Sequence, residues 1–240
     1  MDTVRKLLAL LVPVALGLGV VVGPAAAEPV PGSARNPVLV IGGFDANVGK
    51  LETLREWLGS RGYTAYAMVL PGQPAATAPL VDSARAVADK VAEIRRETGS
   101  ARVDLVGHSM GGLAQRHFVK FLDGRAAVGT YVDFGTPENG VVLALLCAPF
   151  YPGCRDLSPG SPFLTALNAA PAIPPDLPAY HLFSEDAGEE REPLPGATNA
   201  SVQSFCPGRR VSHADEPIDG AFQELIDSAL RGEPLITGCP

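Results

Sequence analysis

The feature that most constrains the fold is the segment 102–122, which reads RVDLVGHSMGGLAQRHFVKFL. Its first residues form a short apolar run typical of a buried strand, and its later apolar residues recur at helical spacing. The sequence GHSMG between the two places Ser109 on a sharp turn. A G-x-S-x-G between a strand and a helix is typical of a nucleophile elbow, in which glycines leave room for neighbouring backbone. The segment therefore predicts a nucleophilic Ser109 at a helix N-terminus, where developing negative charge is stabilised.

The rest of the chain alternates between apolar runs and amphipathic segments. The strongest helical stripe runs from Leu80 to Ile94, where apolar residues recur at intervals of three and four. This alternation predicts an α/β fold with a mostly parallel central sheet and helices on both faces. Active residues are then expected on loops that follow the carboxyl ends of the strands. Further helices are expected over 51–58 and 222–229, and strands over 37–41, 64–69, 129–134 and 179–183.

The first 27 residues have the pattern of a secretory signal peptide. A basic pair, Arg5 and Lys6, precedes an apolar run, and three alanines ending at Ala27 supply small residues for cleavage. The run is short for a membrane span and is interrupted by proline and glycine. We therefore expect a secreted protein in which residues 28–240 form a single α/β domain.

The charge balance is acidic, with 19 lysine and arginine residues against 26 aspartate and glutamate residues and a net charge of −7. An acidic chain without basic clusters argues against nucleic-acid binding. The sequence also lacks a phosphate-binding loop, a dinucleotide-binding fingerprint and a zinc-binding HExxH motif. We expect neither a cofactor nor a metal, and we infer no stable protein partner.

The four cysteines indicate disulfides, because the thiols of exported proteins are usually oxidised. Three pairings are possible. We prefer Cys147 with Cys154, which closes a small loop rich in turn-forming residues, and Cys206 with Cys239, which ties the C-terminus. This pairing avoids long crossings between distant loops.

Four segments of the sequence resemble those of secreted bacterial lipases of the α/β-hydrolase fold, in particular the small class 2 type. They are NPVLVIGGF at 36–44, LPG at 70–72, VDLVGHSMGGLAQRHFV at 103–119 and FGTPENG at 134–140. The resemblance covers the first two-thirds of the mature chain. The family usually reads HGF where this chain has GGF, and GTPH where this chain has GTPE. The resemblance implies a serine hydrolase that acts on ester or lipid substrates and allows contact with a lipid interface.

The loop after the first strand, Ile41 to Asp45, is expected to contribute to an oxyanion hole. In a serine hydrolase of this kind that loop supplies one main-chain N–H, and the residue after the nucleophile supplies the other. This assigns the main-chain N–H groups of Phe44 and Met110 to the oxyanion hole.

The base and the acid follow the serine in the order serine, acid, histidine. Of the four histidines, only His213 is both late in the chain and in a loop, so it is expected to be the base. Asp186 follows the strand over 179–183 at the S-x-D position of the family, and it is expected to orient His213. Asp156 is the alternative acid.

The leading hypothesis is a secreted lipase or esterase that cleaves carboxylic ester bonds through an acyl-enzyme. An acyltransferase or thioesterase with the same triad is one alternative, and a non-catalytic, hydrolase-like envelope protein is another. A complete set of Ser109, His213 and Asp186 argues against the non-catalytic alternative. The apolar segment over 141–150, VVLALLCAPF, either lines an acyl groove or forms a core helix.

Overall fold

The computed structural model describes residues 35–44 and 46–240, so the predicted signal peptide over 1–27 lies outside the described residues. Within them, six strands form one sheet in the order β2-β1-β3-β4-β5-β6, and every neighbouring pair is parallel. The predicted α/β fold with a parallel sheet is confirmed. The strands are β1 (Val38–Ile41), β2 (Ala65–Met68), β3 (Val103–His108), β4 (Val128–Phe134), β5 (Ala179–Phe183) and β6 (Thr198–Ser201).

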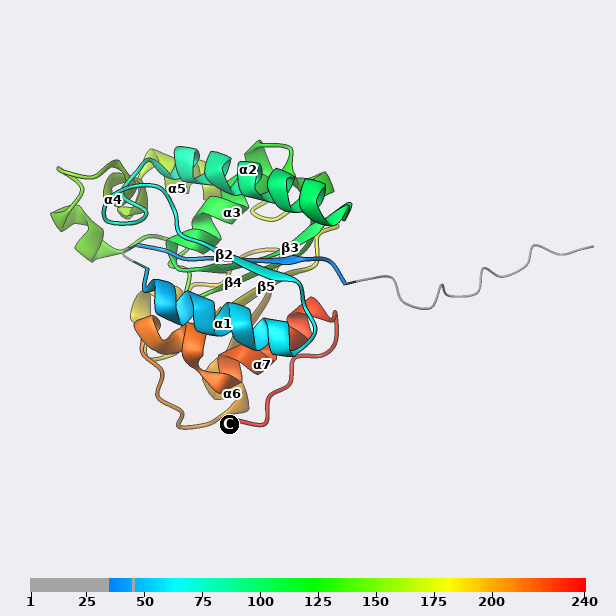
Figure 1. Ribbon diagram of the computed structural model, residues 1–240. Helices are drawn as coiled ribbons and strands as arrows, with labels where there is room; N and C mark the ends of the chain where they lie inside the picture. The colour runs from blue at the N-terminus through cyan, green and yellow to red at the C-terminus, as the bar shows by residue number, and fades with distance from the viewer. Residues whose placement is uncertain (1–34, 45) are drawn as a thin grey trace, which may run out of the picture. The chain divides into compact units, whose positions relative to one another are not determined.

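Helices cover both faces of this sheet (Figure 1). The longer helices α2 and α3 lie on one face together with α5, and α1 and α7 lie on the other face together with α6. The α-helices are α1 (Val48–Ser60), α2 (Leu80–Thr98), α3 (Met110–Phe121), α4 (Pro152–Leu157), α5 (Pro162–Asn168), α6 (Val202–Phe205) and α7 (Gly220–Leu230). Short 3₁₀ helices are η1 (Gly124–Ala127), η2 (Val142–Leu146), η3 (Gly188–Glu190) and η4 (His213–Ile218).

The interior strand β1 shows why the core has two halves. Its four residues are fully buried, and successive side chains of a strand point to opposite faces. Leu39 and Ile41 therefore pack in the apolar cluster under α2 and α3, whereas Val38 and Val40 pack in the cluster under α1 and α7. A strand buried on both faces reads as a continuous apolar run, which is the pattern of its sequence.

Helix α2 shows how the sequence sets the bounds of an element. The stripe of apolar residues faces the core, and all of its members from Leu80 to Ile94 are buried. The helix ends before Gly99, which adopts the left-handed conformation at φ 71° and donates its N–H to the carbonyl of Arg95. Glycine is the residue that adopts this conformation at least cost.

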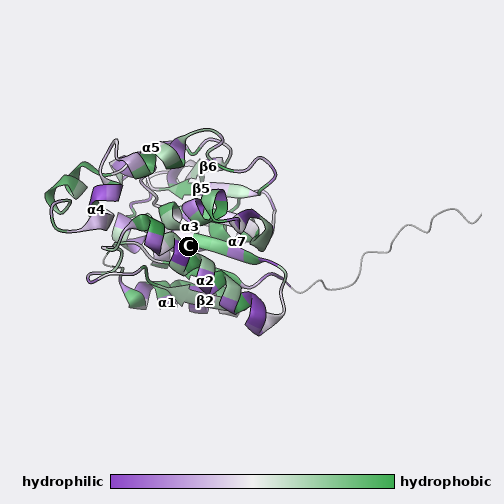
Figure 2. Ribbon diagram, turned by 90° about the horizontal axis from the view of Figure 1, so that it is seen from above, coloured by the Kyte–Doolittle hydropathy of each residue, from purple (hydrophilic) through white to green (hydrophobic). Residues whose placement is uncertain are grey.

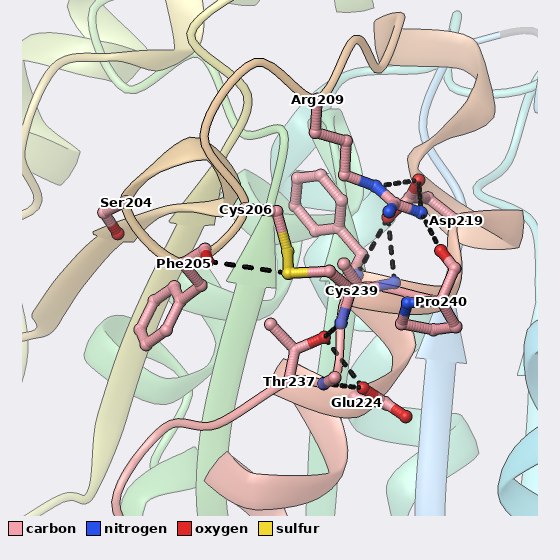
Figure 3. The surroundings of a disulfide bond; sticks show 12 residues. Ser204, Phe205, Cys206, Arg209, Asp219, Glu224, Thr237, Cys239 and Pro240 are labelled. Atoms are coloured by element: carbon pink, nitrogen blue, oxygen red, sulfur yellow. Dashed lines mark hydrogen bonds and ion pairs between the residues drawn. A yellow bond between two sulfur atoms is a disulfide. The ribbon is translucent and has the colours of Figure 1, made fainter.

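Two disulfides join Cys147 to Cys154 and Cys206 to Cys239, which is the pairing preferred from the sequence. Figure 3 shows the second bridge, beside which Asp219 accepts a hydrogen bond from Arg209. The bridge thus anchors the end of the chain near the segment that leads into η4. Disulfides of this kind indicate an oxidising environment. None of the helices in the described ranges is long and apolar enough to cross a membrane.

Candidate active site

Ser109 lies on the sharp turn between β3 and α3. Its backbone has φ 58° and ψ −128°, a conformation that non-glycine residues seldom adopt. The turn is held because Ser109 N–H donates to the Phe134 carbonyl at 3.1 Å, and the Thr136 hydroxyl donates to the Ser109 carbonyl at 3.2 Å. This geometry projects the Ser109 hydroxyl from the carboxyl end of β3, at the first turn of α3.

The loop after β1 lies directly against this turn. A Cβ atom on Gly43 would stand 2.6 Å from Ser109 Cβ and 2.9 Å from Met110 N, so only glycine fits. A Cβ atom on Gly111 would likewise stand 2.4 Å from the Ile41 carbonyl oxygen. The two glycines therefore allow the loop and the turn to approach each other. As a result, the main chain at Gly43, just before Phe44, lies close to that of Met110.

His213 lies beside Ser109, as the sequence predicted. Its Nε2 atom is 3.1 Å from Ser109 Oγ, and its side chain is 41% exposed. His213 is the first residue of η4, so its position follows from the loop that connects β6 and α6 to α7. The distance is that of a hydrogen bond, which allows the imidazole to take the hydroxyl proton.

The carboxylate beside the other nitrogen of His213 belongs to Glu190, a residue that the sequence patterns did not predict. Glu190 Oε1 contacts His213 Nδ1, and the Glu190 side chain is only 4% exposed. Glu190 is the last residue of η3, in the loop that follows β5. Its backbone carbonyl accepts a hydrogen bond from His181 Nε2 at 3.0 Å, which fixes this end of the loop to the sheet.

The prediction that Asp186 contacts His213 is wrong. Asp186 accepts the Val211 N–H at 3.0 Å and forms an ion pair with Arg210 at 3.2 Å, so its carboxylate holds the segment before His213 rather than the imidazole. The alternative, Asp156, accepts the Leu80 N–H at 2.8 Å, at the first turn of α2. Strand β5 ends at Phe183, and the chain runs past Asp186 into η3, whose last residue, Glu190, occupies the position beside His213 that was expected of Asp186.

A second carboxyl group lies behind His213. Glu216 Oε2 is 3.8 Å from His213 Nδ1 and 3.2 Å from His108 Nε2, and Glu216 is fully buried. Burial raises the pKa of Glu216 well above its ordinary value, and the charge of Glu190 raises it further. Burial lowers the pKa of His108 to about 3, with a contribution from the charge of His213. We call these four residues, His108, Glu190, His213 and Glu216, the histidine–carboxyl cluster.

A separate group of buried charges lies between α3 and the sheet. Arg116 Nη2 is 2.5 Å from Glu138 Oε2, and His181 Nδ1 is 2.5 Å from Asp133 Oδ1. Burial lowers the pKa of His181, but the charge of Asp133 and its hydrogen bond outweigh burial and raise that pKa to about 9. We call Arg116, Asp133, Glu138 and His181 the arginine cluster. Each acidic group of this cluster is paired with a basic one, Glu138 with Arg116 and Asp133 with His181.

Two clefts meet at Ser109. The larger encloses about 400 Å³ and is lined mainly by apolar side chains, among them Leu143, Ala144 and Leu157. The smaller encloses about 190 Å³ and includes Asn47 and Lys50. Ser109, His213 and Phe44 line both clefts. A molecule that crosses Ser109 can therefore place a larger apolar part on one side and a smaller part on the other.

The segment around η2 forms an exposed apolar wall of the larger cleft. It is therefore not a core helix, which was one of the two alternatives left open by the sequence. Figure 2 shows hydrophobic residues in this part of the chain, beside α4. The disulfide between Cys147 and Cys154 ties the wall to α4. We call its exposed side chains the apolar rim; they are between 55% and 77% exposed and comprise Val142, Leu143, Leu145, Leu146 and Phe150.

A parallel sheet covered by helices on both faces, with a serine on the turn after a strand and a histidine and carboxylate from later loops, defines an α/β hydrolase. A sequence profile described as the alpha/beta hydrolase family matches residues 38–235, and the chain belongs to this family. A sequence comparison with curated proteins finds no match.

Solved structures with a similar fold include two lipases. Aspergillus fumigatus lipase B has a TM-score of 0.70 and 16% identity over 84% of this chain. The chain spans only 54% of the length of that lipase. The mature form of the Bacillus licheniformis lipase BlEst2 has a TM-score of 0.58 and 18% identity, covering 72% of this chain and 88% of its own. The lin2722 gene product of Listeria innocua has a TM-score of 0.56 and 15% identity, covering 85% and 96%.

Proposed function

We propose that the protein is a secreted serine hydrolase that cleaves carboxylic esters with an apolar acyl group, as lipases and esterases do. The observation that carries this proposal is the line of contacts from Ser109 Oγ through the two nitrogens of His213 to Glu190 Oε1. That line is the arrangement a nucleophile, a general base and an orienting acid require. It lies where the two clefts meet, so a substrate bond can be placed at the serine.

In the proposed mechanism, Ser109 attacks the ester carbonyl while His213 Nε2 accepts its proton. Glu190 holds the imidazole through Nδ1 and stabilises the imidazolium that forms. The main-chain N–H groups of Phe44 and Met110 stabilise the oxyanion, a role supported by the close approach of the two loops at Gly43. His213 then protonates the leaving alcohol, and water repeats the sequence on the acyl-enzyme to release the acid.

The shapes of the clefts suggest which part of the ester goes where. The larger, mainly apolar cleft suits the acyl chain, and the apolar rim extends that surface outward. The smaller cleft, of about 190 Å³, suits a compact alcohol. The two disulfides, together with the signal-peptide pattern of residues 1–27, support export to an oxidising compartment.

Hydrolysis of p-nitrophenyl esters with short and long acyl chains tests the proposal. We expect measurable turnover that Ser109→Ala reduces by about 10⁶-fold in kcat, because the nucleophile is lost. A fluorophosphonate probe should label the wild type at Ser109. Ser60→Ala, which changes an exposed serine at the end of α1, is the matched control and should keep both turnover and labelling. Unchanged hydrolysis or labelling in Ser109→Ala would contradict the proposed nucleophile.

A further inference from the structure

Two glutamates from separate elements converge beneath His213. Glu190 comes from η3 and Glu216 from η4, and both are buried from solvent. In the described part of the chain, no lysine or arginine forms an ion pair with either carboxyl. Two ionised carboxylates placed side by side without a cation repel each other and lose their hydration.

Both glutamates have buried oxygens without a hydrogen-bond partner, and a proton shared between the two carboxyls resolves this. Glu190 Oε1 contacts His213, but Glu190 Oε2 is buried and no donor reaches it among the described residues. Both oxygens of Glu216 are also buried without a hydrogen-bond partner. An ionised carboxylate only accepts hydrogen bonds, whereas a protonated one also donates. A proton on Glu216 therefore gives Glu190 the donor that it lacks.

No lysine or arginine within the described ranges pairs with Glu216, and the main-chain N–H of Ser184 is the group that favours its ionised form. A Cβ atom on Gly135, which has φ 59°, would stand 2.0 Å from Glu216 Oε2. The backbone at Gly135 therefore packs directly against this carboxyl oxygen. The titratable groups that face Glu216 are Glu190 from η3, His108 from β3, and His213 and Asp219 on its own segment. Burial keeps His108 neutral above a pKa of about 3, so it does not offset a second negative charge.

We propose that Glu216 is a positioning residue that stays protonated in the working enzyme and donates this proton to Glu190 Oε2. This inference rests on the proposed triad of Ser109, His213 and Glu190. The two carboxyls then carry a single negative charge, which faces His213 through Glu190 Oε1. When His213 accepts the serine proton, one negative charge balances one positive charge. A second negative charge would favour the imidazolium before the reaction and so remove the base.

Difference infrared spectroscopy tests the protonation state without any need for turnover. At neutral pH, the wild type minus Glu216→Gln should show the carbonyl stretch of a protonated carboxylic acid that is present only in the wild type. Glu192→Gln, which changes an exposed carboxylate two residues after Glu190, is the matched control and should show no such band. The absence of a carboxylic-acid band from the Glu216→Gln difference would overturn the proposal.

The pH dependence of kcat/KM for an ester tests the positioning role. Glu216→Gln keeps a neutral donor, so the acidic limb of the profile, which reports protonation of the base, should stay where it is in the wild type. If Glu216 were ionised instead, Glu216→Gln would remove a nearby anion and move that limb to lower pH by about one pH unit or more, which would overturn the proposal. Glu216→Leu removes the donor and should lower kcat by about 10- to 100-fold.

The outcomes separate this inference from the proposed function. If Ser109→Ala stays fully active, the triad is wrong, while the infrared band still decides whether Glu216 is protonated. If Ser109→Ala is inactive and the band is absent, the triad stands and the shared proton does not. Circular dichroism of each variant confirms that the fold is retained.

Discussion

The two buried charged clusters of this molecule are neighbours but differ in their balance of charge. In the arginine cluster, Arg116 is paired with Glu138 and a protonated His181 with Asp133, so each acidic group has a basic partner. Burial raises the pKa of Glu138 to about 7. In the histidine–carboxyl cluster, Glu190 and Glu216 face His213 and a neutral His108. A single hydrogen bond, from His181 to the carbonyl of Glu190, joins the two clusters.

This difference indicates that one cluster supports the structure and the other serves the reaction. A fully paired buried cluster offers no charge to a neighbour, and its removal leaves uncompensated charges inside the protein. The arginine cluster therefore acts as a support that holds the backbone of Glu190. The histidine–carboxyl cluster lacks a permanent cation, so its negative charge remains available to His213 when that residue accepts a proton. We therefore expect changes in the histidine–carboxyl cluster to affect turnover, and changes in the arginine cluster to affect the free energy of unfolding.

The largest expected effect comes from removing the charge of Glu190. In Glu190→Gln, the amide favours the wrong tautomer of His213 and cannot stabilise the imidazolium. In a comparable triad such a change costs on the order of 10⁴-fold in kcat, or roughly 5 kcal/mol of barrier. Ester turnover is the measurement, with circular dichroism to confirm folding. Glu192→Gln should retain full turnover. Near-normal turnover in a folded Glu190→Gln would contradict the role of Glu190 as the acid that orients His213.

The arginine cluster should instead respond in stability. In Arg116→Met, Glu138 loses a partner at 2.5 Å in a site where Arg116 is 1% exposed. Breaking a buried pair in this way costs about 3–5 kcal/mol of unfolding free energy. Urea denaturation measures this loss. Arg125→Met removes an ion pair with Asp176, whose side chain is 75% exposed, and should cost less than about 1 kcal/mol. Equal losses in the two variants would show that burial does not distinguish them.

The two clusters should also give opposite dependences of stability on pH. The pKa of His181 is raised from 6.5 to about 9, so its contribution is complete below pH 6.5 and is lost as the pH rises through 9. The pKa of His108 is lowered from 6.5 to about 3, so its contribution is complete above pH 6.5 and is lost as the pH falls through 3. Each effect should amount to about 1–3 kcal/mol.

Urea denaturation across this pH range separates the two histidines. The difference in unfolding free energy between the wild type and His181→Gln should shrink from pH 7 to pH 9. The difference between the wild type and His108→Gln should shrink from pH 6.5 to pH 3. If either variant changed the pH dependence in both the alkaline and the acidic range, the assignment of one range to each cluster would be contradicted.

The fold was predictable where a local pattern fixes an element. The stripe from Leu80 to Ile94 predicted α2, and the fully apolar β1 predicted a strand buried on both faces. Strand β6, with the sequence TNAS, has no apolar run or alternation, and it forms because it pairs with the edge of β5. Its existence depends on tertiary pairing, which no window of the sequence contains.

The same reasoning explains which site residues were predictable. Ser109 is fixed by the local demands of a strand–turn–helix, and His213 by its order in the chain and the lack of another candidate. The position of the acid depends on the number of residues in the loop between β5 and η3, and no periodicity of the sequence sets that number. Glu190 stands four residues beyond Asp186 in an acidic stretch, and only the fold shows that it is buried. The usable signal for Glu216 is its spacing of three residues from His213, which brings the two together on η4.

The smallest effect is expected for the residue that the sequence favoured as the acid. Asp186→Asn keeps an oxygen that can accept the Val211 N–H, and it loses only the ion pair with Arg210, whose side chain is 86% exposed. Such a pair is worth less than about 1 kcal/mol, so unfolding free energy should change little. Turnover should stay within about fivefold of the wild type, because that is the rate effect of a barrier change of about 1 kcal/mol. Steady-state hydrolysis of the same ester used for Glu190→Gln makes the contrast direct. A loss near 10⁴-fold in Asp186→Asn, with Glu190→Gln active, would return the acid role to Asp186 and leave the buried pair of glutamates without a catalytic function.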